Sequence, residues 1–292
     1  MRYGDRMRVL VTIPHFYHPD ANSRYGSGQD PAESRLLALR RCVLAWHQHF
    51  GPAQRMIQLA EGRTREVNAA ISGGLEARVH VVLCTVGEAH LLPRLRLDES
   101  LFHHHPTRAQ PDRLGFECQK VLRDRWGNYD WHVYCEDDLI VHDPLWFRKL
   151  AAFGQFAGAD AVLMPHRFER GPTPLVHKAY IDGDLPPEMT APFQTRTDRE
   201  VLDVDWFGQP ARFVRPLNPH AGVVSLTRDQ MSHWMKQPHF LNEDCRFVGP
   251  LESAATLGVM RTFRLYKPAI DQAGLFEIEH HGSRSLDKLR PA

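Results

Sequence analysis

The sequence predicts an α/β protein with a mostly parallel central sheet and helices on both of its faces. Apolar runs of strand length alternate with amphipathic stretches of helix length over the first 165 residues, and this alternation is typical of parallel sheets covered by helices. The chain of 292 residues is long enough for one large α/β domain or two small ones. Its hydrophobic content of 42% and charged content of 24% are those of an ordinary globular protein.

Each element of the first half has its own signal. The run RVLVTIPH (8–15) is apolar at odd and even positions alike, as expected of a strand buried on both faces. Asp30 and Pro31 predict the start of a helix and Gly51 its end. The buried stripe of that helix is predicted to be Leu36, Leu39, Val43, Trp46 and Phe50. Further strands are predicted at 55–60, 79–86, 131–135 and 160–165, and further helices at 111–126 and 143–158.

The second half is less regular. Asp182-Gly183 is a turn signal inside 177–188, and Thr227 with Gln230 predicts a capping box at the start of a short helix. Strands are predicted at 212–217, 221–227 and 261–267, followed by a loose tail. No repeat or long linker divides the chain, so we expect one domain over 1–292, with a regular half (1–165) and an elaborated half (166–292).

Composition excludes several classes of protein. A net charge of +1 argues against a nucleic-acid binder with a broad basic surface. No apolar run approaches about 18 residues, and the first residues lack the apolar core of a signal peptide. The five cysteines show no CxxC spacing, as expected of reduced thiols, so we expect a cytoplasmic protein. The triplet at 103–105 is predicted to be a solvated histidine loop rather than a metal site.

Three consecutive acids, Glu136, Asp137 and Asp138, follow the predicted strand 131–135. In open parallel sheets, ligands bind at the carboxyl ends of the strands. Clustered carboxylates raise one another's pKa unless a cation neutralises them. Oxygen ligands of this kind favour Mg²⁺ or Mn²⁺, often together with substrate phosphates. A solvated acidic turn is the alternative, but the apolar residues at 139–141 disfavour it.

Other acidic pairs give weaker signals. Asp182 and Asp184 flank a glycine, which is typical of a tight turn. Asp203 and Asp205 precede Trp206 in a polar stretch, where a solvated loop and a sugar site are both open.

The stretch YDWHVYCEDDLIVHDPLWF (129–147) resembles the signature of GT-A-type glycosyltransferases, which use nucleotide sugars. In that superfamily a core strand leads into a DxD-like element. The resemblance implies a GT-A-like fold whose first half binds the nucleotide sugar and whose second half binds the acceptor. It implies that Asp138 binds a divalent cation bridging the donor phosphates and that Asp137 faces the donor sugar or ribose. Glu136 stands in place of the first Asp and would touch the ribose, or the metal through water.

The same resemblance implies roles for residues near both ends of the chain. Thr12, Pro14 and His15 end the first strand and would lie against the base and ribose of the donor. A late histidine often completes the metal site in this superfamily, so His280 or His281 is the expected ligand.

Inverting transfer needs a general base for the acceptor hydroxyl. Glu252 lies in the first turn of a predicted short helix that begins near Pro250, and it resembles the base of the superfamily. The alternative is a glutamate favoured near a helix start by the helix dipole alone. Trp206 is the predicted stacking platform for the acceptor, with Asp203 and Asp205 beside it.

The loop at 24–30 leads into a helix whose first amides could meet a phosphate, although it lacks a dinucleotide fingerprint.

Taken together, these residues and the resemblance favour a Mn²⁺- or Mg²⁺-dependent, inverting glycosyltransferase. Its donor would be a UDP or GDP sugar, and its acceptor a saccharide, glycoconjugate or other hydroxyl compound. A nucleotidyltransferase is one alternative, disfavoured because 14–28 has few glycines and one arginine. A non-catalytic protein that binds nucleotides or sugars is the other. The base, the sugar, the acceptor and the oligomeric state stay open.

Overall fold

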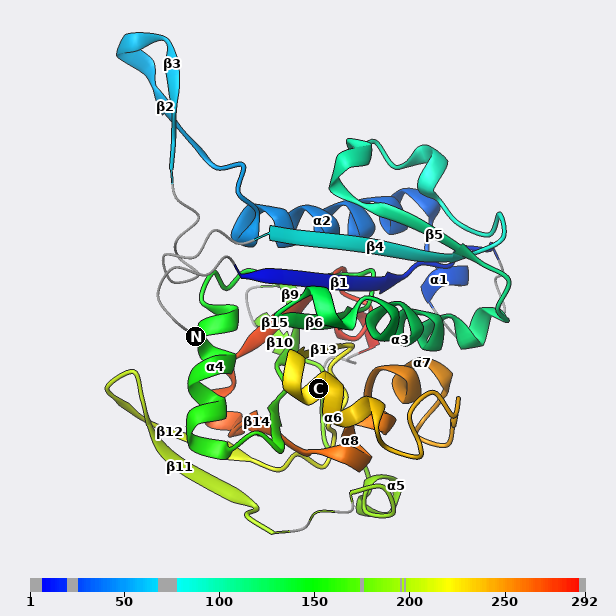
Figure 1. Cartoon of the computed structure of the whole chain (residues 1–292), viewed down its shortest axis with the longest axis vertical. Helices are drawn as coiled ribbons and strands as arrows, with labels where there is room; N and C mark the ends of the chain where they lie inside the picture. The colour runs from blue at the N-terminus through cyan, green and yellow to red at the C-terminus, as the bar shows by residue number, and fades with distance from the viewer. Residues whose placement is uncertain are drawn as a thin grey trace.

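A mostly parallel, five-stranded sheet forms the centre of the computed structural model, as the sequence predicts (Figure 1). The structure describes residues 7–19, 26–67, 78–173, 176–194, 196 and 198–288. The strands of this sheet, in spatial order, are β13 (Val223–Thr227), β6 (Trp131–Cys135), β1 (Arg8–Pro14), β4 (Arg78–Val86) and β5 (His103–Thr107). β1 runs parallel to β4 and β6, and β4 parallel to β5, whereas β13 is antiparallel to β6.

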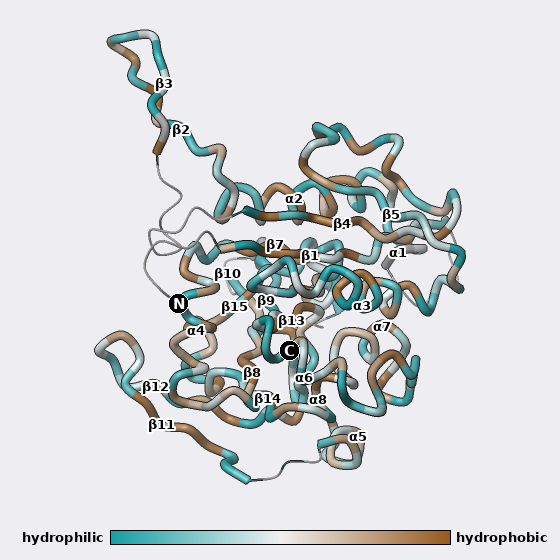
Figure 2. The backbone as a smooth tube through the Cα atoms, in the orientation of Figure 1, coloured by the Kyte–Doolittle hydropathy of each residue, from teal (hydrophilic) through white to brown (hydrophobic). Residues whose placement is uncertain are grey.

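Both faces of the sheet are covered at its centre. Every residue of β1 after Arg8 is buried, which a strand with one open face cannot achieve. α3 (Leu114–Asp124) packs against β1, β4 and β6, and α2 (Ala32–Phe50) packs against β4. Figure 2 shows hydrophobic residues along β1 and β4, where these helices meet the sheet.

The helix α2 agrees with its predicted stripe and adds a charged residue to it. Leu39, Trp46 and Phe50 are fully buried, while Leu36 is only partly buried against the core. Arg35 is also buried, at helical spacing from Leu39. The helix begins at Ala32, and Pro31 rather than Asp30 is the residue that precedes its first turn. Arg35 is thus a buried arginine in the first turn of α2.

Two smaller sheets complete the fold. One has the order β10 (Val176–Tyr180), β9 (His166–Thr173), β15 (Glu277–His280) and β7 (Leu139–Ile140). The other has the order β11 (Val201–Trp206), β12 (Gln209–Val214), β14 (Arg264–Pro268) and β8 (Ala161–Leu163). The region at 160–165 therefore forms a strand outside the central sheet, because β8 pairs with β14. The predicted loose tail is also wrong, since β15 pairs with both β9 and β7.

The region at 55–60 does not join the sheet either. β2 (Arg55–Gln58) and β3 (Arg63–Glu66) form a separate hairpin that stands away from the body (Figure 1). Met56 and Ile57 are 57% and 70% exposed, so the apolar residues of this stretch do not form a core strand. The histidine triplet was expected in a loop, but it forms β5, the edge of the central sheet, where His104 Nε2 lies 2.8 Å from Thr85 Oγ1.

Asp182 does not form the predicted turn. Its carboxylate is buried and accepts hydrogen bonds from Arg167 Nε at 2.8 Å and Lys267 Nζ at 2.9 Å. Lys267 is 1% exposed, so this ion pair is inside the protein. The antiparallel hairpin of this region is formed earlier, by β9 and β10.

Apart from α4, which has 12 residues, the remaining helices are short. The capping box of Thr227 and Gln230 is present at the start of α6. The first turn of α7 begins at Pro250, as predicted, and continues through a π-helical turn (Ser253–Leu257) into α8. Of the predicted phosphate loop, residues 24 and 25 lie outside the described residues, and the rest leads through α1. These helices are α1 (Gly26–Gln29), α4 (Trp146–Ala157), α5 (Pro187–Thr190), α6 (Arg228–Met235), α7 (Pro250–Glu252) and α8 (Gly258–Thr262).

Candidate active site

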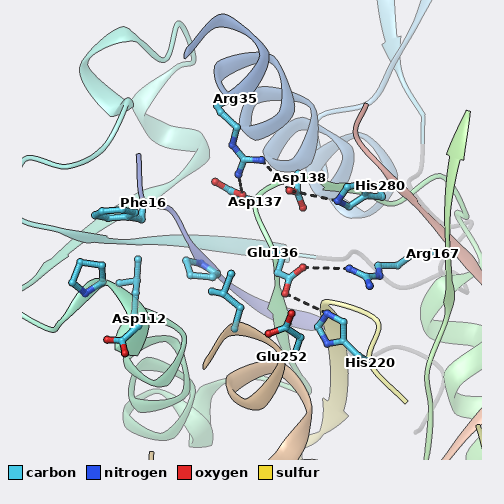
Figure 3. A pocket seen from close by; sticks show the side chains of 14 residues that line it. Phe16, Arg35, Asp112, Glu136, Asp137, Asp138, Arg167, His220, Glu252 and His280 are labelled. Atoms are coloured by element: carbon cyan, nitrogen blue, oxygen red, sulfur yellow. Dashed lines mark hydrogen bonds and ion pairs between the residues drawn. The ribbon is translucent and has the colours of Figure 1, made fainter. Parts of the chain in front are cut away.

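A cavity of about 360 Å³ opens at the carboxyl ends of β1 and β6 (Figure 3). One end is mostly apolar, and Figure 3 shows Phe16 and Asp112 there. The other end is charged, and Figure 3 shows Glu136 at its centre between acidic and basic neighbours. The lining residues are Pro14, Phe16, Arg35, Pro111, Asp112, Leu114, Glu136, Asp137, Asp138, Arg167, His220, Leu251, Glu252 and His280.

Asp137 is fully engaged by the protein. Its Oδ2 lies 2.6 Å from His15 Nδ1, and its Oδ1 accepts a hydrogen bond from Arg35. His15 Nε2 accepts from the backbone amide of Leu91 at 3.1 Å, so the ring proton is on Nδ1 and is donated to Asp137. Asp137 therefore holds His15 and Arg35 in place, and each of its oxygens already has one partner in the protein.

Asp138 keeps one oxygen open. Its Oδ2 accepts from Arg35 Nη1 at 2.9 Å and lies 3.7 Å from His280 Nε2. Its Oδ1 is buried, and no described residue donates a hydrogen bond to it. Burial by itself would raise the pKa of this carboxyl, but His280 and Arg35 outweigh burial and hold the pKa well below its usual range. The residue is therefore a carboxylate with one buried, unpaired oxygen.

Glu136 has an arginine, a histidine and a second acid as neighbours. Arg167 Nη1 is 3.8 Å from its Oε2, and His220 Nε2 is 3.7 Å from its Oε1. Figure 3 shows the carboxyl group of Glu252 beside it. Burial raises the pKa of Glu136 to about 7, because Arg167 compensates only partly and the negative charges of Asp138 and Glu252 add to the rise.

Glu252 enters the cavity from α7. Pro250 begins this helix, and the chain passes directly from Glu252 into the π-helical turn. Helix segments of this kind often occur at functional sites. Glu252 Oε2 is buried, and no hydrogen-bond donor among the described residues reaches it. A buried acceptor without a partner is costly, so this oxygen is suited to accept a proton or hydrogen bond from a bound molecule.

The two late histidines are directed differently. His280 lines the cavity, and the carboxylates of Asp138 and Glu169 raise its pKa against the lowering effect of burial. His281 does not line it, and its Nδ1 lies 3.1 Å from Arg41 Nη1. Alternation along a strand explains the difference, because neighbouring side chains of β15 and its continuation point to opposite sides.

Asp138 and His280 are the pair that could hold a divalent cation. No group of three or more His, Cys, Asp or Glu residues is arranged for a metal within the described part of the chain. A cation bound jointly with substrate phosphates needs only one or two protein ligands. The open Asp138 Oδ1 and the nearby His280 Nε2 fit that requirement.

The first strand contributes less than expected. Pro14 lines the cavity, but Thr12 is fully buried, with its hydroxyl 3.3 Å from the carbonyl oxygen of Val133. His15 is fully buried against Asp137. Phe16, which sequence reasoning missed, lines the cavity instead of His15. The alternation of side chains along an extended chain is the signal that pairs Phe16 with Pro14.

The predicted acceptor residues are not brought to this cavity. Trp206 is 3% exposed and packs against Phe213, with ring centroids 4.9 Å apart. Asp203 forms an exposed ion pair with Arg212, and Asp205 accepts from the amide of Gly208 at 2.7 Å. All three predicted residues belong to β11, whose hairpin with β12 lies away from α7 and α3 in Figure 1.

Sequence reasoning also missed the basic residues of the site. Arg35 had a usable signal, an arginine at helical spacing with Leu39 and Trp46. Arg167 and His220 had none, because only tertiary contacts bring β9 and the segment before β13 to the acids. Arg35 and Arg167 compensate part of the negative charge of the acids that line the cavity.

No protein-family model and no curated protein matches the chain. Among solved structures, the fold is similar to that of a protein from Desulfovibrio desulfuricans G20 described as a "putative nucleotide-diphospho-sugar transferase". The TM-score is 0.41 at 11% identity, over 90% of this chain and 79% of that one. A likeness of this degree assigns no activity to this chain. No membrane-spanning helix is found within the described residues.

Proposed function

We propose that this chain is a metal-dependent glycosyltransferase. It would move a sugar from a UDP- or GDP-type nucleotide sugar to an acceptor hydroxyl, with inversion at the anomeric carbon. The observation that carries the proposal is that Glu252 and the Asp138–His280 pair line the same cavity (Figure 3). This cavity lies at the carboxyl edge of a parallel sheet, where ligands of open α/β sheets bind.

The two ends of the cavity suit the two parts of a nucleotide sugar. Phe16, Pro111 and Leu114 offer apolar surface for a nucleobase at one end. Glu136, Arg167 and His220 offer hydrogen-bonding groups for sugar hydroxyls at the other. The diphosphate would then lie near Arg35 and Asp138, between the two ends. The lining of the cavity thus supports a nucleotide sugar as the donor.

Asp138 and His280 are the residues that would hold Mn²⁺ or Mg²⁺, together with the donor phosphates. A neutral imidazole ligand favours Mn²⁺. When bound, the cation neutralises the charge that develops on the departing diphosphate. Arg35 holds the carboxylates of Asp138 and Asp137 in place through its two hydrogen bonds.

Glu252 supplies the base. As the acceptor oxygen forms its bond to the anomeric carbon, the bond from that carbon to the diphosphate oxygen breaks and the diphosphate keeps the electron pair. The acceptor proton passes to the carboxylate of Glu252, whose Oε2 has no protein donor among the described residues. A single displacement of this kind inverts the anomeric centre.

Titration calorimetry with UDP, GDP and their sugars, with and without Mn²⁺, tests the proposal. We expect at least one nucleoside diphosphate to bind, and to bind more tightly with Mn²⁺. An assay of free nucleotide with a panel of saccharide acceptors then tests transfer. Release of pyrophosphate from a nucleoside triphosphate and a sugar phosphate would identify a nucleotidyltransferase instead. Binding without any turnover would favour a non-catalytic protein, and no nucleotide binding at all would contradict the proposal.

A further inference from the structure

Glu169 lies behind the cavity and contacts the residue that we assign to the cation. It belongs to β9, next to β15, and its side chain is 0% exposed. His280 Nδ1 lies 3.1 Å from Glu169 Oε1. The same carboxylate accepts hydrogen bonds from the backbone amides of Ser285, at 2.9 Å, and Leu286, at 2.9 Å. One buried carboxylate therefore binds both the ring of His280 and the segment that follows it.

We infer that Glu169 is a positioning residue that sets the tautomer of His280 and directs its Nε2 lone pair towards the cation site; this rests on the proposed function. A carboxylate has no proton to donate, so His280 Nδ1 must carry the hydrogen of their bond. In the neutral ring, Nε2 then holds the lone pair, and it is Nε2 that lies 3.7 Å from Asp138 Oδ2. Histidine ligands of metals are commonly fixed in this way by a carboxylate on their other ring nitrogen.

A purely structural role is the rival explanation. The bonds to Ser285 and Leu286 would by themselves hold the segment after β15 against the body. Glu169→Gln separates the two roles. Its carbonyl oxygen can still accept from the backbone amides, whereas its NH₂ group can face His280 only as a donor. His280 Nδ1 must then accept, which moves the ring proton to Nε2 and removes the lone pair from the cation site.

The tautomer is measured first, without metal. Histidine ¹⁵N shifts of the metal-free protein in alkaline buffer, where the ring is neutral, distinguish the two tautomers; His280→Gln identifies the resonance. We expect the Nδ1–H tautomer in the wild type and the Nε2–H tautomer in Glu169→Gln. The matched control is Glu277→Gln, the same change on β15, where the carboxylate bonds Tyr180 and Lys178 instead. An unchanged tautomer in Glu169→Gln, with the fold intact by circular dichroism, would overturn the inference.

Cation affinity is measured second. Free Mn²⁺ is followed by electron paramagnetic resonance as it is titrated into protein with UDP or GDP. We expect Glu169→Gln to weaken Mn²⁺ binding by about 10–100-fold, the usual effect of losing such a partner, and Glu277→Gln to leave it unchanged. Equal affinity in Glu169→Gln and wild type would overturn the inference. If the wild type itself binds no Mn²⁺, the proposed metal dependence fails, and the ligand role of His280 fails with it. In that case the tautomer of His280, which is measured without metal, still shows whether Glu169 orients the ring. The two failures can therefore be told apart.

Discussion

Gly222 makes room for the carboxylate of Glu136. A methyl group at Gly222 would overlap Glu136 Oε2 and lie 2.9 Å from Leu139 Cδ1. Gly222 also has φ of +62°, in the left-handed region that favours glycine. The backbone before β13 therefore determines where the central acid of the cavity can lie.

Gly222→Ala should displace Glu136 and impair both stability and transfer. We expect a loss of about 1–3 kcal/mol in the free energy of unfolding, the usual range for a strained backbone position, together with reduced kcat. Urea unfolding and steady-state kinetics measure the two effects. Gly208→Ala is the matched control, since Gly208 has φ of +81° and no atom where its methyl would lie. It should lose stability through the backbone alone and keep its kinetics. Equal kinetics in both variants would show that Glu136 has no part in transfer.

Glu252→Gln should lower transfer by about 10²–10⁴-fold, the range for losing a positioned base. Donor affinity, measured by calorimetry, should stay nearly unchanged. Glu117→Gln is a suitable control, because Glu117 lies in the first turn of α3 and does not line the cavity. The stereochemistry of the product, read by NMR, gives a separate check. Normal turnover in Glu252→Gln, or retention of the donor's configuration, would reduce Glu252 to a glutamate that stabilises its helix.

Asp138→Asn should remove the effect of Mn²⁺ on nucleotide binding. The loss should exceed the 10–100-fold typical of an outer-shell partner, because Asp138 would contact the cation directly. Asp137→Asn gives the comparison. Both Asp137 oxygens are engaged by His15 and Arg35, so this variant should lose thermal stability more than Mn²⁺ dependence. Full Mn²⁺ dependence in Asp138→Asn would rule the triplet out as the metal site.

Trp206→Ala should act on stability alone. Trp206 is 3% exposed and packs against Phe213, so its truncation should cost about 3–5 kcal/mol, as for other large core aromatic residues. Thermal unfolding measures this loss. The KM for the acceptor, measured at a temperature where the variant is folded, should not change. A raised KM with unchanged stability would restore the acceptor role that the sequence suggested.

The pH dependence of stability should depend on Glu279. Burial alone would raise the pKa of this carboxyl, but a hydrogen bond from His142 and the charges of Arg41 and Arg170 outweigh it and lower the pKa to about 2 from 4.5. Because the folded-state pKa is lowered, the stabilisation is present above about pH 4.5 and is lost as the pH falls towards 2. Urea unfolding of wild type and Glu279→Gln should differ most near neutral pH and converge in acid. A difference that grows on acidification would contradict this ion network.

The sequence predicted the elements with strong local signals and missed those made by distant pairing. β1, β4 and β6 are apolar runs with clear ends, and their burial on both faces agrees with those runs. β15 was missed although its residues alternate between apolar and polar, because the strand is only four residues long and its partners β9 and β7 are distant in sequence. The opposite error occurred at β2, where apolar residues predicted a core strand but lie in an exposed hairpin.

The residues of the candidate site also divide into those with a local sequence signal and those brought in by the tertiary fold. Asp138 and Glu252 were predicted because each follows a local landmark, the end of a strand or the start of a helix. The geometry between them depends on Arg35 and Arg167, whose charges partly compensate the acids, and on His220, which lies beside Glu136. Charge balance of this kind is set by three-dimensional proximity, and one sequence does not reveal it. Trp206 was misjudged for the opposite reason, since a polar neighbourhood in sequence concealed a buried ring.

β15 also has a consequence for biosynthesis. It is the last described strand to be translated, yet it fits between β9 and β7, which are made much earlier. On the ribosome, Glu136, Asp137 and Asp138 are therefore made long before His280. During that interval the edges of β9 and β7 that face β15 have no strand to pair with. A nascent chain would thus lack the Asp138–His280 pair until β15 has docked, and the uncovered edge of β9 would be the place where a chaperone or a neighbouring nascent chain could attach.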